Sequence, residues 1–252
     1  MKSKVTAIIQ ARMTSTRLPG KVLMEVMGRP LLSYLIERVR FSKMIDKIII
    51  ATTVNKEDDP IVELCQKEDI IFYRGSEDDV LDRYYQAAKK YNATHIMRLT
   101  ADCPLIDPRV CDFVAEKYIS VDVDYVHTGQ SFCEGIGCEV FNFDVLEKMW
   151  KNARLKSERE HVTLYARNHW DELNCITLEN ETDDSNYRVT VDEKKDFLVV
   201  KALFENLYVK NEEPCSISEI KNFLDVHPEI FSLNAGIVRN EGLLKSLIED
   251  GY

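Results

Sequence analysis

The segment IIQARMTSTRLPGK, from Ile8 to Lys21, carries the residue types best suited to chemistry. An apolar run that favours a buried strand leads there into a long polar loop. Main-chain N–H groups in such a loop can bind phosphate oxygens. Arg12, Arg17 and Lys21 can neutralise a triphosphate and a departing pyrophosphate. The pattern therefore predicts a phosphate site, with a purely solubilising basic surface loop as the alternative.

This loop differs from two common phosphate-binding loops. A Walker loop needs glycine five residues before Gly20, where Ser15 stands, and Ser or Thr after Lys21, where Val22 stands. The dinucleotide fingerprint GxGxxG does not occur in the sequence. The loop therefore indicates phosphate binding of another kind.

Two aspartates follow runs that favour strands. Asp102 lies in RLTADCPL, and Asp192 ends YRVTVD. Mg²⁺ prefers one or two carboxylates together with waters and phosphate oxygens. If the two runs are neighbours, Asp102 and Asp192 flank one Mg²⁺ site. The alternatives are that Asp192 caps the helix that follows it and that Asp102 makes a local Asx turn.

Strand and helix patterns alternate through the first half of the chain, which predicts a parallel sheet with crossover helices. Ligands of such sheets bind beyond the carboxyl ends of the strands, where the basic loop and Asp102 fall. The expected strands are Val5–Ile9, Lys47–Thr53, Ile70–Tyr73 and Thr94–Thr100. The expected helices are Leu31–Arg40, Ile61–Glu68, Val80–Tyr91 and one that opens at Asp107-Pro108.

The second half is less regular. Strands are expected at Asp124–His127, Gly137–Phe143 and Tyr187–Val191, and helices at Ser157–Arg167 and Lys194–Leu207. Helix starts are expected at Asp59-Pro60 and at two capping-box patterns, Ser76-x-x-Asp79 and Ser216-x-x-Glu219. We expect one domain over residues 1–213, with residues 214–252 as its C-terminal helical extension.

Composition narrows the function classes. The 252 residues carry a formal net charge of −10, which disfavours nucleic acid as a partner. Seven cysteines, an odd number without a CxxC pair, indicate neither a disulfide framework nor a zinc knuckle. Free thiols fit a reducing cytosol, and no apolar run resembles a signal or membrane segment. We therefore expect a cytoplasmic protein with no membrane partner.

Together, these motifs resemble those of the cytidylyltransferases that activate acidic sugars, such as sialic acid and 3-deoxy-manno-octulosonate. The branch labelled spore coat polysaccharide biosynthesis protein is the most similar. The matching stretches are IIQARMTSTRLPGK, FYRGSEDDVLDRY, RLTADCPLIDP, SEREHVT and YRVTVDEKKDF, which together span most of residues 5–200. The resemblance implies a Rossmann-like three-layer α/β/α nucleotidyltransferase fold with a mixed, mainly parallel sheet, and a homodimer.

The resemblance also implies roles for single residues. Arg12 and Lys21 would bind and polarise the triphosphate of a nucleotide, with CTP expected, and Asp102 and Asp192 would hold Mg²⁺. The other residues assigned to the nucleotide are Gln10, Ala11, Arg17, Gly20, Arg74 and Asp79. The residues assigned to a small sugar-like acceptor are Gly135, Glu139, Arg159, His161 and Arg188.

Some residues depart from the family pattern or have structural alternatives. Those enzymes commonly have proline where Gln10 stands, and residues 132–139 contain no Arg or Lys to bind a sugar carboxylate. His161 is also explained as a hydrogen-bonded structural histidine, and Arg159 with Glu160 as an ordinary surface pair.

The expected reaction is cytidylyl transfer, in which an acceptor oxygen attacks the α-phosphorus of CTP and pyrophosphate leaves. One rival is a glycosyltransferase of related fold, which typically uses a D-x-D motif. Asp122-Val123-Asp124 fits those letters but precedes an expected strand instead of following one. The other rival is a nucleotide-binding protein without turnover.

Overall fold

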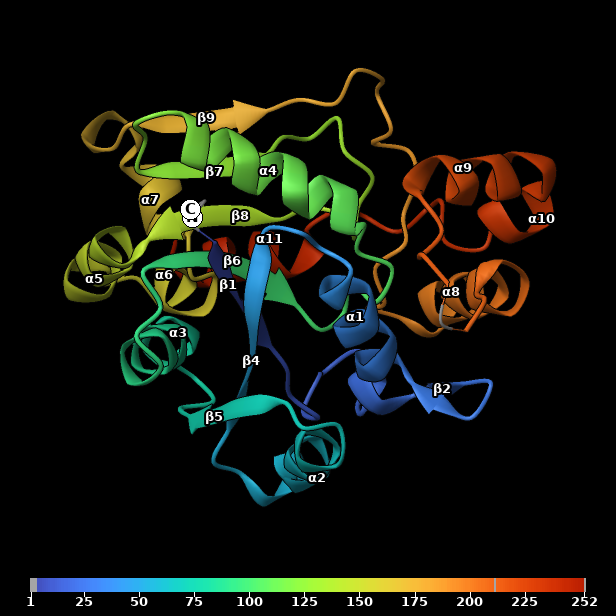
Figure 1. The fold of residues 1–252 in the computed structure, drawn as a ribbon, viewed down its shortest axis with the longest axis horizontal. Coiled ribbons are helices and arrows are strands. Elements are labelled where there is room, and N and C mark those ends of the chain that lie inside the picture. The colour runs from blue at the N-terminus through green and yellow to red at the C-terminus, as the bar shows by residue number, and fades with distance from the viewer. Residues whose placement is uncertain (1–3, 211, 252) are drawn as a thin grey trace.

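A computed structural model describes residues 4–210 and 212–251 of the chain. Over these residues, the main sheet has seven strands in the order β5-β4-β1-β6-β8-β7-β9 (Figure 1). Its strands are β1 (Val5–Gln10), β4 (Ile45–Thr53), β5 (Ile71–Gly75), β6 (His95–Thr100), β7 (Tyr125–Thr128), β8 (Glu139–Asn142) and β9 (Cys175–Leu178). β8 is antiparallel to both of its neighbours, and the other pairs are parallel. The mixed, mainly parallel sheet is confirmed.

Helices cover both faces of this sheet and give the three layers expected. The helices are α1 (Leu31–Arg40), α2 (Asp59–Lys67), α3 (Val80–Lys90), α4 (Pro108–Ser120), α5 (Phe143–Asn152), α6 (Lys156–Glu160), α7 (Leu164–Asn168), α8 (Lys194–Leu207), α9 (Ile217–Val226), α10 (Pro228–Phe231) and α11 (Glu241–Glu249). One apolar cluster joins a sheet face to α1, α2 and α4, and another joins the opposite face to α3, α5 and α7.

The central strand β1 shows why short apolar runs form this sheet. Ala7 and Ile9 pack on the side of α1, whereas Ile8 packs on the side of α3. A strand buried on both faces reads as a continuous apolar run, because successive side chains point to opposite faces. β1 ends at Gln10 between β4 and β6, so the basic loop leaves the sheet at the carboxyl ends of parallel strands.

The expected strand Tyr187–Val191 is wrong. Arg188 makes only an isolated bridge to Glu134, and the segment is not a strand of the sheet. Its main chain is nevertheless tied to the loop that follows β6, because the Val191 N–H donates to the Asp102 carbonyl at 2.7 Å. Val189 and Val191 belong to a smaller apolar cluster with α8 and α9, which explains the strand-like composition.

Three other local expectations are corrected. The helix Ser157–Arg167 is interrupted at residues 161–163, between α6 and α7. Ser76 does not cap a helix; Asp79 caps α3, and its carboxylate accepts from the Asp82 N–H. Helix α2 begins at Asp59, so Asp59 lies inside it and is not its cap. The caps at Asp107 and Ser216 are confirmed.

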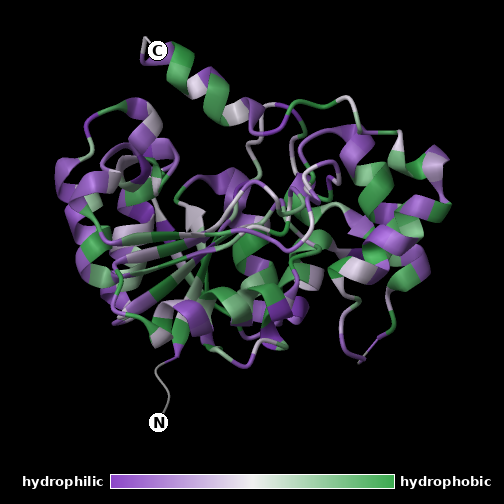
Figure 2. Ribbon diagram, turned by 90° about the horizontal axis from the view of Figure 1, so that it is seen from above, coloured by the Kyte–Doolittle hydropathy of each residue, from purple (hydrophilic) through white to green (hydrophobic). Residues whose placement is uncertain are grey.

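The C-terminal residues form two separate packing units. Helices α9 and α10 pack beside α8 at one end of the molecule (Figure 1). Helix α11 instead crosses to α6, and Figure 2 shows it on the opposite side of the ribbon from the N-terminus. Within the described ranges, no helix has both the length and the apolar composition that a membrane crossing requires.

Asp58 links the basic loop to the sheet. Its buried carboxylate accepts from the Met13 N–H at 2.6 Å and from the N–H of Thr53 at the end of β4. It also accepts from the Thr53 hydroxyl. Asp58 therefore anchors the loop between β1 and Gly20 to the neighbouring strand.

We expect Asp58→Ala to lower the free energy of unfolding by about 2–4 kcal/mol, because it leaves several buried donors without an acceptor. Urea unfolding followed by circular dichroism measures the change. Asp46→Ala, at an exposed position of β4, is the control and should stay within about 0.5 kcal/mol of wild type. Equal effects of the two substitutions would contradict the anchoring role.

Candidate active site

The ammonium group of Lys21 lies between the carboxylates of Asp102 and Asp192. Its Nζ is 3.1 Å from Asp102 Oδ2 and 2.9 Å from Asp192 Oδ1. Lys21 follows the basic loop, Asp102 follows β6, and Asp192 precedes α8. The structure thus brings together the lysine and the two aspartates singled out in the sequence.

Burial and mutual attraction set the protonation states of these groups. Burial alone raises the pKa of Asp102, but the Lys21 charge and hydrogen bonds from neighbouring groups outweigh it and lower the pKa to about 2. Burial lowers the pKa of Lys21, but Asp102 and Asp192 outweigh burial and raise it. At neutral pH the Lys21 ammonium and the Asp102 carboxylate therefore face one another as ions.

Asp192 is held by further cations. Its Oδ1 also lies 2.8 Å from Arg17, and its Oδ2 lies 3.0 Å from Arg188. Asp196 fixes Arg188 in turn and accepts from the Asp192 N–H at 3.0 Å. Glu193 and not Asp192 is the N-cap of α8, so the capping alternative for Asp192 is wrong.

The carboxylate pair fits a hard divalent cation. Both carboxylates face one point, which the Lys21 ammonium occupies, and carboxylate oxygens are the ligands that Mg²⁺ prefers. Within residues 4–210 and 212–251, no group of three or more His, Cys, Asp or Glu side chains forms a metal site. A two-carboxylate site completed by phosphate oxygens is consistent with Mg²⁺ chemistry.

The basic loop is closed by its own main chain. Gly20 donates to the Met13 carbonyl at 2.8 Å and adopts φ +72°, a left-handed conformation that favours glycine. In the described part of the chain, the main-chain N–H groups of Thr14 to Arg17 have no protein acceptor. A turn with free N–H groups beside Arg17 and Lys21 suits an anion.

The other residues assigned to the nucleotide lie along β1, β5 and the start of α3. The buried Oε1 of Gln10 has no hydrogen-bond partner among the described residues. Arg12 is partly exposed and lies 3.8 Å from Glu77. Arg74 and Asp79 are engaged within the protein, Arg74 with the Thr53 carbonyl and Asp79 with Arg159.

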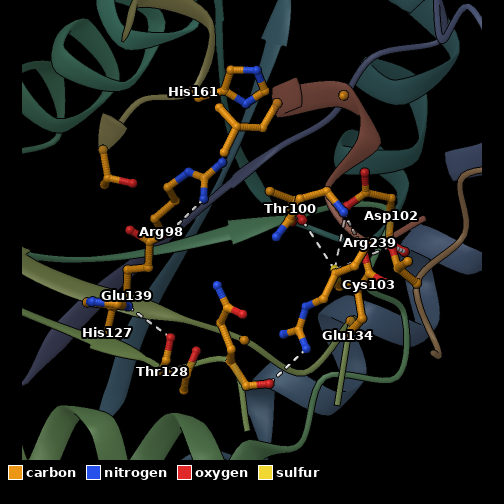
Figure 3. Close-up of a pocket in the computed structure, with 18 of the residues that line it drawn as sticks. Arg98, Thr100, Asp102, Cys103, His127, Thr128, Glu134, Glu139, His161 and Arg239 are labelled. Carbon is orange, nitrogen blue, oxygen red and sulfur yellow. Dashed lines mark hydrogen bonds and ion pairs between the residues drawn. The ribbon is translucent and has the colours of Figure 1, made fainter. Parts of the chain in front are cut away.

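A cavity of about 580 Å³ opens on the other side of the carboxylate pair, over β6, β7 and β8. We call it the β6–β8 cavity. Figure 3 shows Asp102 and Cys103 at one end and Arg98, His127 and Glu139 at the other. The assigned residues that line it are Arg17, Asp102, Gly135, Glu139, His161 and Asp192. Three of the five positions predicted for the acceptor thus meet both predicted metal positions around one space.

Glu139 forms a charged cluster at the far end of this cavity. Its Oε1 accepts from Arg98 at 2.8 Å and from Arg167 at 2.9 Å, and the Tyr125 hydroxyl donates to Oε2. Burial raises the pKa of Glu139, but the guanidinium groups of Arg167 and Arg98 outweigh it and hold the pKa well below 4.5. Arg98 and Arg167 gave no signal in the sequence, because they lie on different elements.

The remaining acceptor assignments have structural partners. Arg159 binds Asp79 and the Trp150 carbonyl, and Arg188 binds Asp192 and Asp196; neither lines the β6–β8 cavity. His161 does line the cavity, and its Nε2 lies 2.9 Å from the hydroxyl of Ser246 on α11.

Sequence reasoning assigned no single residue to the C-terminal part of the cavity wall. Residues 239–243, which we call the roof segment, line it together with β6–β8. Figure 3 draws Arg239 among the residues that line the cavity. No strand or helix pattern pointed to these residues, because their partners are distant in sequence.

A family comparison is consistent with this geometry. The sequence model of the cytidylyltransferase family matches residues 6–232, which include Lys21, Asp102 and Asp192. The chain belongs to the cytidylyltransferase family.

Relatives of this cytidylyltransferase match nearly its whole length. An uncharacterized protein of Methanocaldococcus jannaschii is 41% identical over 93% of this chain and 96% of its own. The spore coat polysaccharide biosynthesis protein SpsF of Bacillus subtilis is 36% identical over 88% of this chain and 94% of its own. A cytidylyltransferase from Leptospira borgpetersenii, whose structure is known, is 32% identical in sequence. Its structure superposes with a TM-score of 0.87 over 94% of this chain and 99% of its own. The expected family and the nucleotidyltransferase fold are confirmed.

Gly135 allows the Asp192 segment to approach the cavity wall. It adopts φ +101°, and a Cβ atom there would lie 2.5 Å from the Thr190 main-chain nitrogen.

We expect Gly135→Ala to reduce the free energy of unfolding by about 2–4 kcal/mol and to reduce turnover. Chemical denaturation measures the first effect. Gly236→Ala, where no atom crowds the Cβ and φ is not positive, is the matched control. A harmless Gly135→Ala variant would refute the close approach.

The charged cluster predicts a pH-dependent stability. The folded-state pKa of Glu139 lies below its ordinary value of 4.5, so its stabilisation is complete above about pH 4.5 and is lost as the pH falls through the folded-state pKa. Glu139→Gln should therefore cost about 3–5 kcal/mol at pH 7 and less at pH 3. Urea denaturation at both pH values tests this, with Glu63→Gln on α2 as an exposed control. If the free energy of unfolding of Glu139→Gln differed from that of wild type by the same amount at both pH values, the prediction would be contradicted.

Proposed function

We propose that this cytidylyltransferase transfers the cytidylyl group of CTP to a hydroxyl of a sugar acid and releases pyrophosphate, in the synthesis of a surface polysaccharide. The observation that carries the proposal is the position of Lys21, Asp102 and Asp192 between the basic loop and the β6–β8 cavity. The motif resemblance to enzymes that activate acidic sugars supports the class of acceptor, and the name of the Bacillus subtilis relative supports the pathway.

The basic loop binds the triphosphate in this proposal. The N–H groups of residues 14–17 face no protein acceptor in the described chain and are available to phosphate oxygens. Arg12 and Lys21 neutralise the charge that grows on the leaving pyrophosphate. The main contribution of the protein is therefore positioning and electrostatic stabilisation.

Asp102 and Asp192 hold Mg²⁺ in this proposal. When bound, Mg²⁺ supplies Lewis-acid polarisation of the α-phosphoryl group. Arg188 and Asp196 orient the Asp192 carboxylate, and Lys21 helps to keep the Asp102 carboxylate ionised. The Lys21 ammonium faces both carboxylates, so it would lie beside a phosphate group bound there.

The acceptor occupies the β6–β8 cavity, and its hydroxyl faces the α-phosphorus near Asp102. A new bond forms between the hydroxyl oxygen and the α-phosphorus, the bond to pyrophosphate breaks, and the hydroxyl proton is released. Gln10 lies on the opposite, nucleotide side of this junction. Its buried, unpartnered Oε1 can accept a hydrogen bond from an amino group of a base.

The glycosyltransferase alternative is disfavoured by the placement of its motif. Asp122 and Asp124 precede β7, which runs parallel to β6 because both are antiparallel to β8. They therefore lie at the edge of the sheet opposite Asp102.

We also propose a homodimer in the cytoplasm. The family resemblance supports the homodimer, and the cysteines, none of which forms a disulfide in the described residues, support the location.

Lys21→Ala and Asp102→Asn should each lower pyrophosphate release from CTP by at least about 10²–10³-fold, because each removes charge stabilisation at the reacting phosphate. The assay supplies CTP, Mg²⁺ and a panel that includes 3-deoxy-manno-octulosonate, N-acetylneuraminate and neutral sugars. Circular dichroism checks that the sheet stays folded. Lys67→Ala, on the exposed surface of α2, is the matched control.

Calorimetry separates nucleotide binding from turnover. We expect Mg²⁺-dependent binding of CTP in preference to UTP, GTP and ATP. Near wild-type rates of pyrophosphate release in Lys21→Ala or Asp102→Asn would contradict the site assignment. CTP binding without pyrophosphate release for any acceptor would favour a binding protein without turnover, and sugar transfer from a nucleotide sugar would favour the glycosyltransferase.

A further inference from the structure

The roof segment closes the β6–β8 cavity through polar contacts that come from several elements. Glu241 pairs with Arg17 at 2.9 Å, and the Asn240 N–H donates to Glu134 at 3.2 Å. The rest of α11 is fixed on α6, where Ser246 contacts His161 and Asp250 accepts from the Ser157 N–H. The roof segment is therefore a positioned wall of the cavity.

Arg239 differs from the other arginines that line this cavity. Arg17 pairs with Asp192 and Glu241, and both Arg98 and Arg167 pair with Glu139. Among the described residues, Arg239 has no carboxylate partner; its Nη1 donates only to the Gln130 carbonyl, at 2.8 Å. A carbonyl dipole leaves the positive charge of the guanidinium available to an anion.

The carboxylates on the same wall have other partners. Glu134 pairs with Arg188 at 2.6 Å and also accepts from the Asn240 N–H. Glu179 accepts from the N–H and the hydroxyl of Ser131. Glu179 and Asp183 lie close enough to feel the charge of Arg239, but no carboxylate of the described residues forms a close ion pair with it.

Arg239 lines the same cavity as Asp102, and its guanidinium is held there by the Gln130 carbonyl. An anion bound by Arg239 would thus share this cavity with the hydroxyl that faces Asp102. A planar guanidinium binds a carboxylate through two parallel hydrogen bonds. A phosphate ester carries about two charges, which one unpaired cation matches less well.

We propose that Arg239 binds the carboxylate of the acceptor and selects acids over their neutral analogues. This rests on the proposed function and adds an acceptor-binding residue to it. It also supplies the cation that residues 132–139 lack. Arg239 lies beyond residues 6–232, the part matched by the family model. The selecting group is thus outside the segment that carries the proposed nucleotide and metal residues.

The test measures kcat and KM for pyrophosphate release with 3-deoxy-manno-octulosonate and N-acetylneuraminate, each compared with its C1 amide. Arg239→Ala should raise KM for the acid about 10- to 100-fold, as expected for loss of a hydrogen bond to a charged group. It should change kcat less and remove most of the preference for the acid over the amide. Arg239→Lys should restore part of that preference, because it keeps the charge.

Two further variants separate this role from a structural one. Arg239→Gln keeps a donor for the Gln130 carbonyl but loses the charge, so it should resemble Arg239→Ala. Arg40→Ala is the matched control, because Arg40 is exposed on α1 and its Nη2 likewise donates to a carbonyl, that of Glu68. It should leave both kinetic constants unchanged.

Several results would overturn the proposal. One is an unchanged acid-to-amide preference in Arg239→Ala. Another is a changed preference in Arg167→Ala alone, which would place the carboxylate at the Glu139 cluster. Faster turnover of sugar phosphates than of acids would indicate a phosphate ligand instead. Failure of the proposed function looks different, since CTP would then not bind or no acceptor would release pyrophosphate from the wild-type protein.

Discussion

The ion cluster around Lys21 is the interaction on which the site depends. An ammonium group and two carboxylates from distant parts of the chain can be desolvated together only if their charges are matched and held in place. The surrounding structure meets that condition. Arg188 and Asp196 fix Asp192, and Asp102, which follows β6, accepts a hydrogen bond from the Val191 N–H at its carbonyl.

The sheet joins two halves with different tasks. On the side of β1, β4 and β5 lies a loop with unpaired N–H groups and cations, which suits a polyanion. On the side of β8, β7 and β9 lies a polar cavity with fixed charge pairs, which suits a hydroxylated molecule. β6 separates the halves, and Asp102 at its end belongs to both. Group transfer between two bound molecules needs such a boundary.

Local patterns were sufficient for the central strands and for the residues that follow them. β1 and β4 are predictable because strands buried on both faces are short β-branched runs, and Asp102 because it directly follows such a run. Tyr187–Val191 has the same composition but packs against α8 and outside the sheet, which only its distant partners decide. Asp58, Arg98 and Arg239 were missed for the same reason, since each acts through residues more than forty positions away.

Arg17 connects the two halves. It is shared between Asp192 in the ion cluster and Glu241 in the roof segment. A triphosphate bound at the same loop would compete for this guanidinium with both carboxylates. Arrival of the nucleotide and release of the roof segment are then thermodynamically linked, and the linkage acts equally in both directions. One guanidinium would thereby make the binding of each substrate depend on the presence of the other.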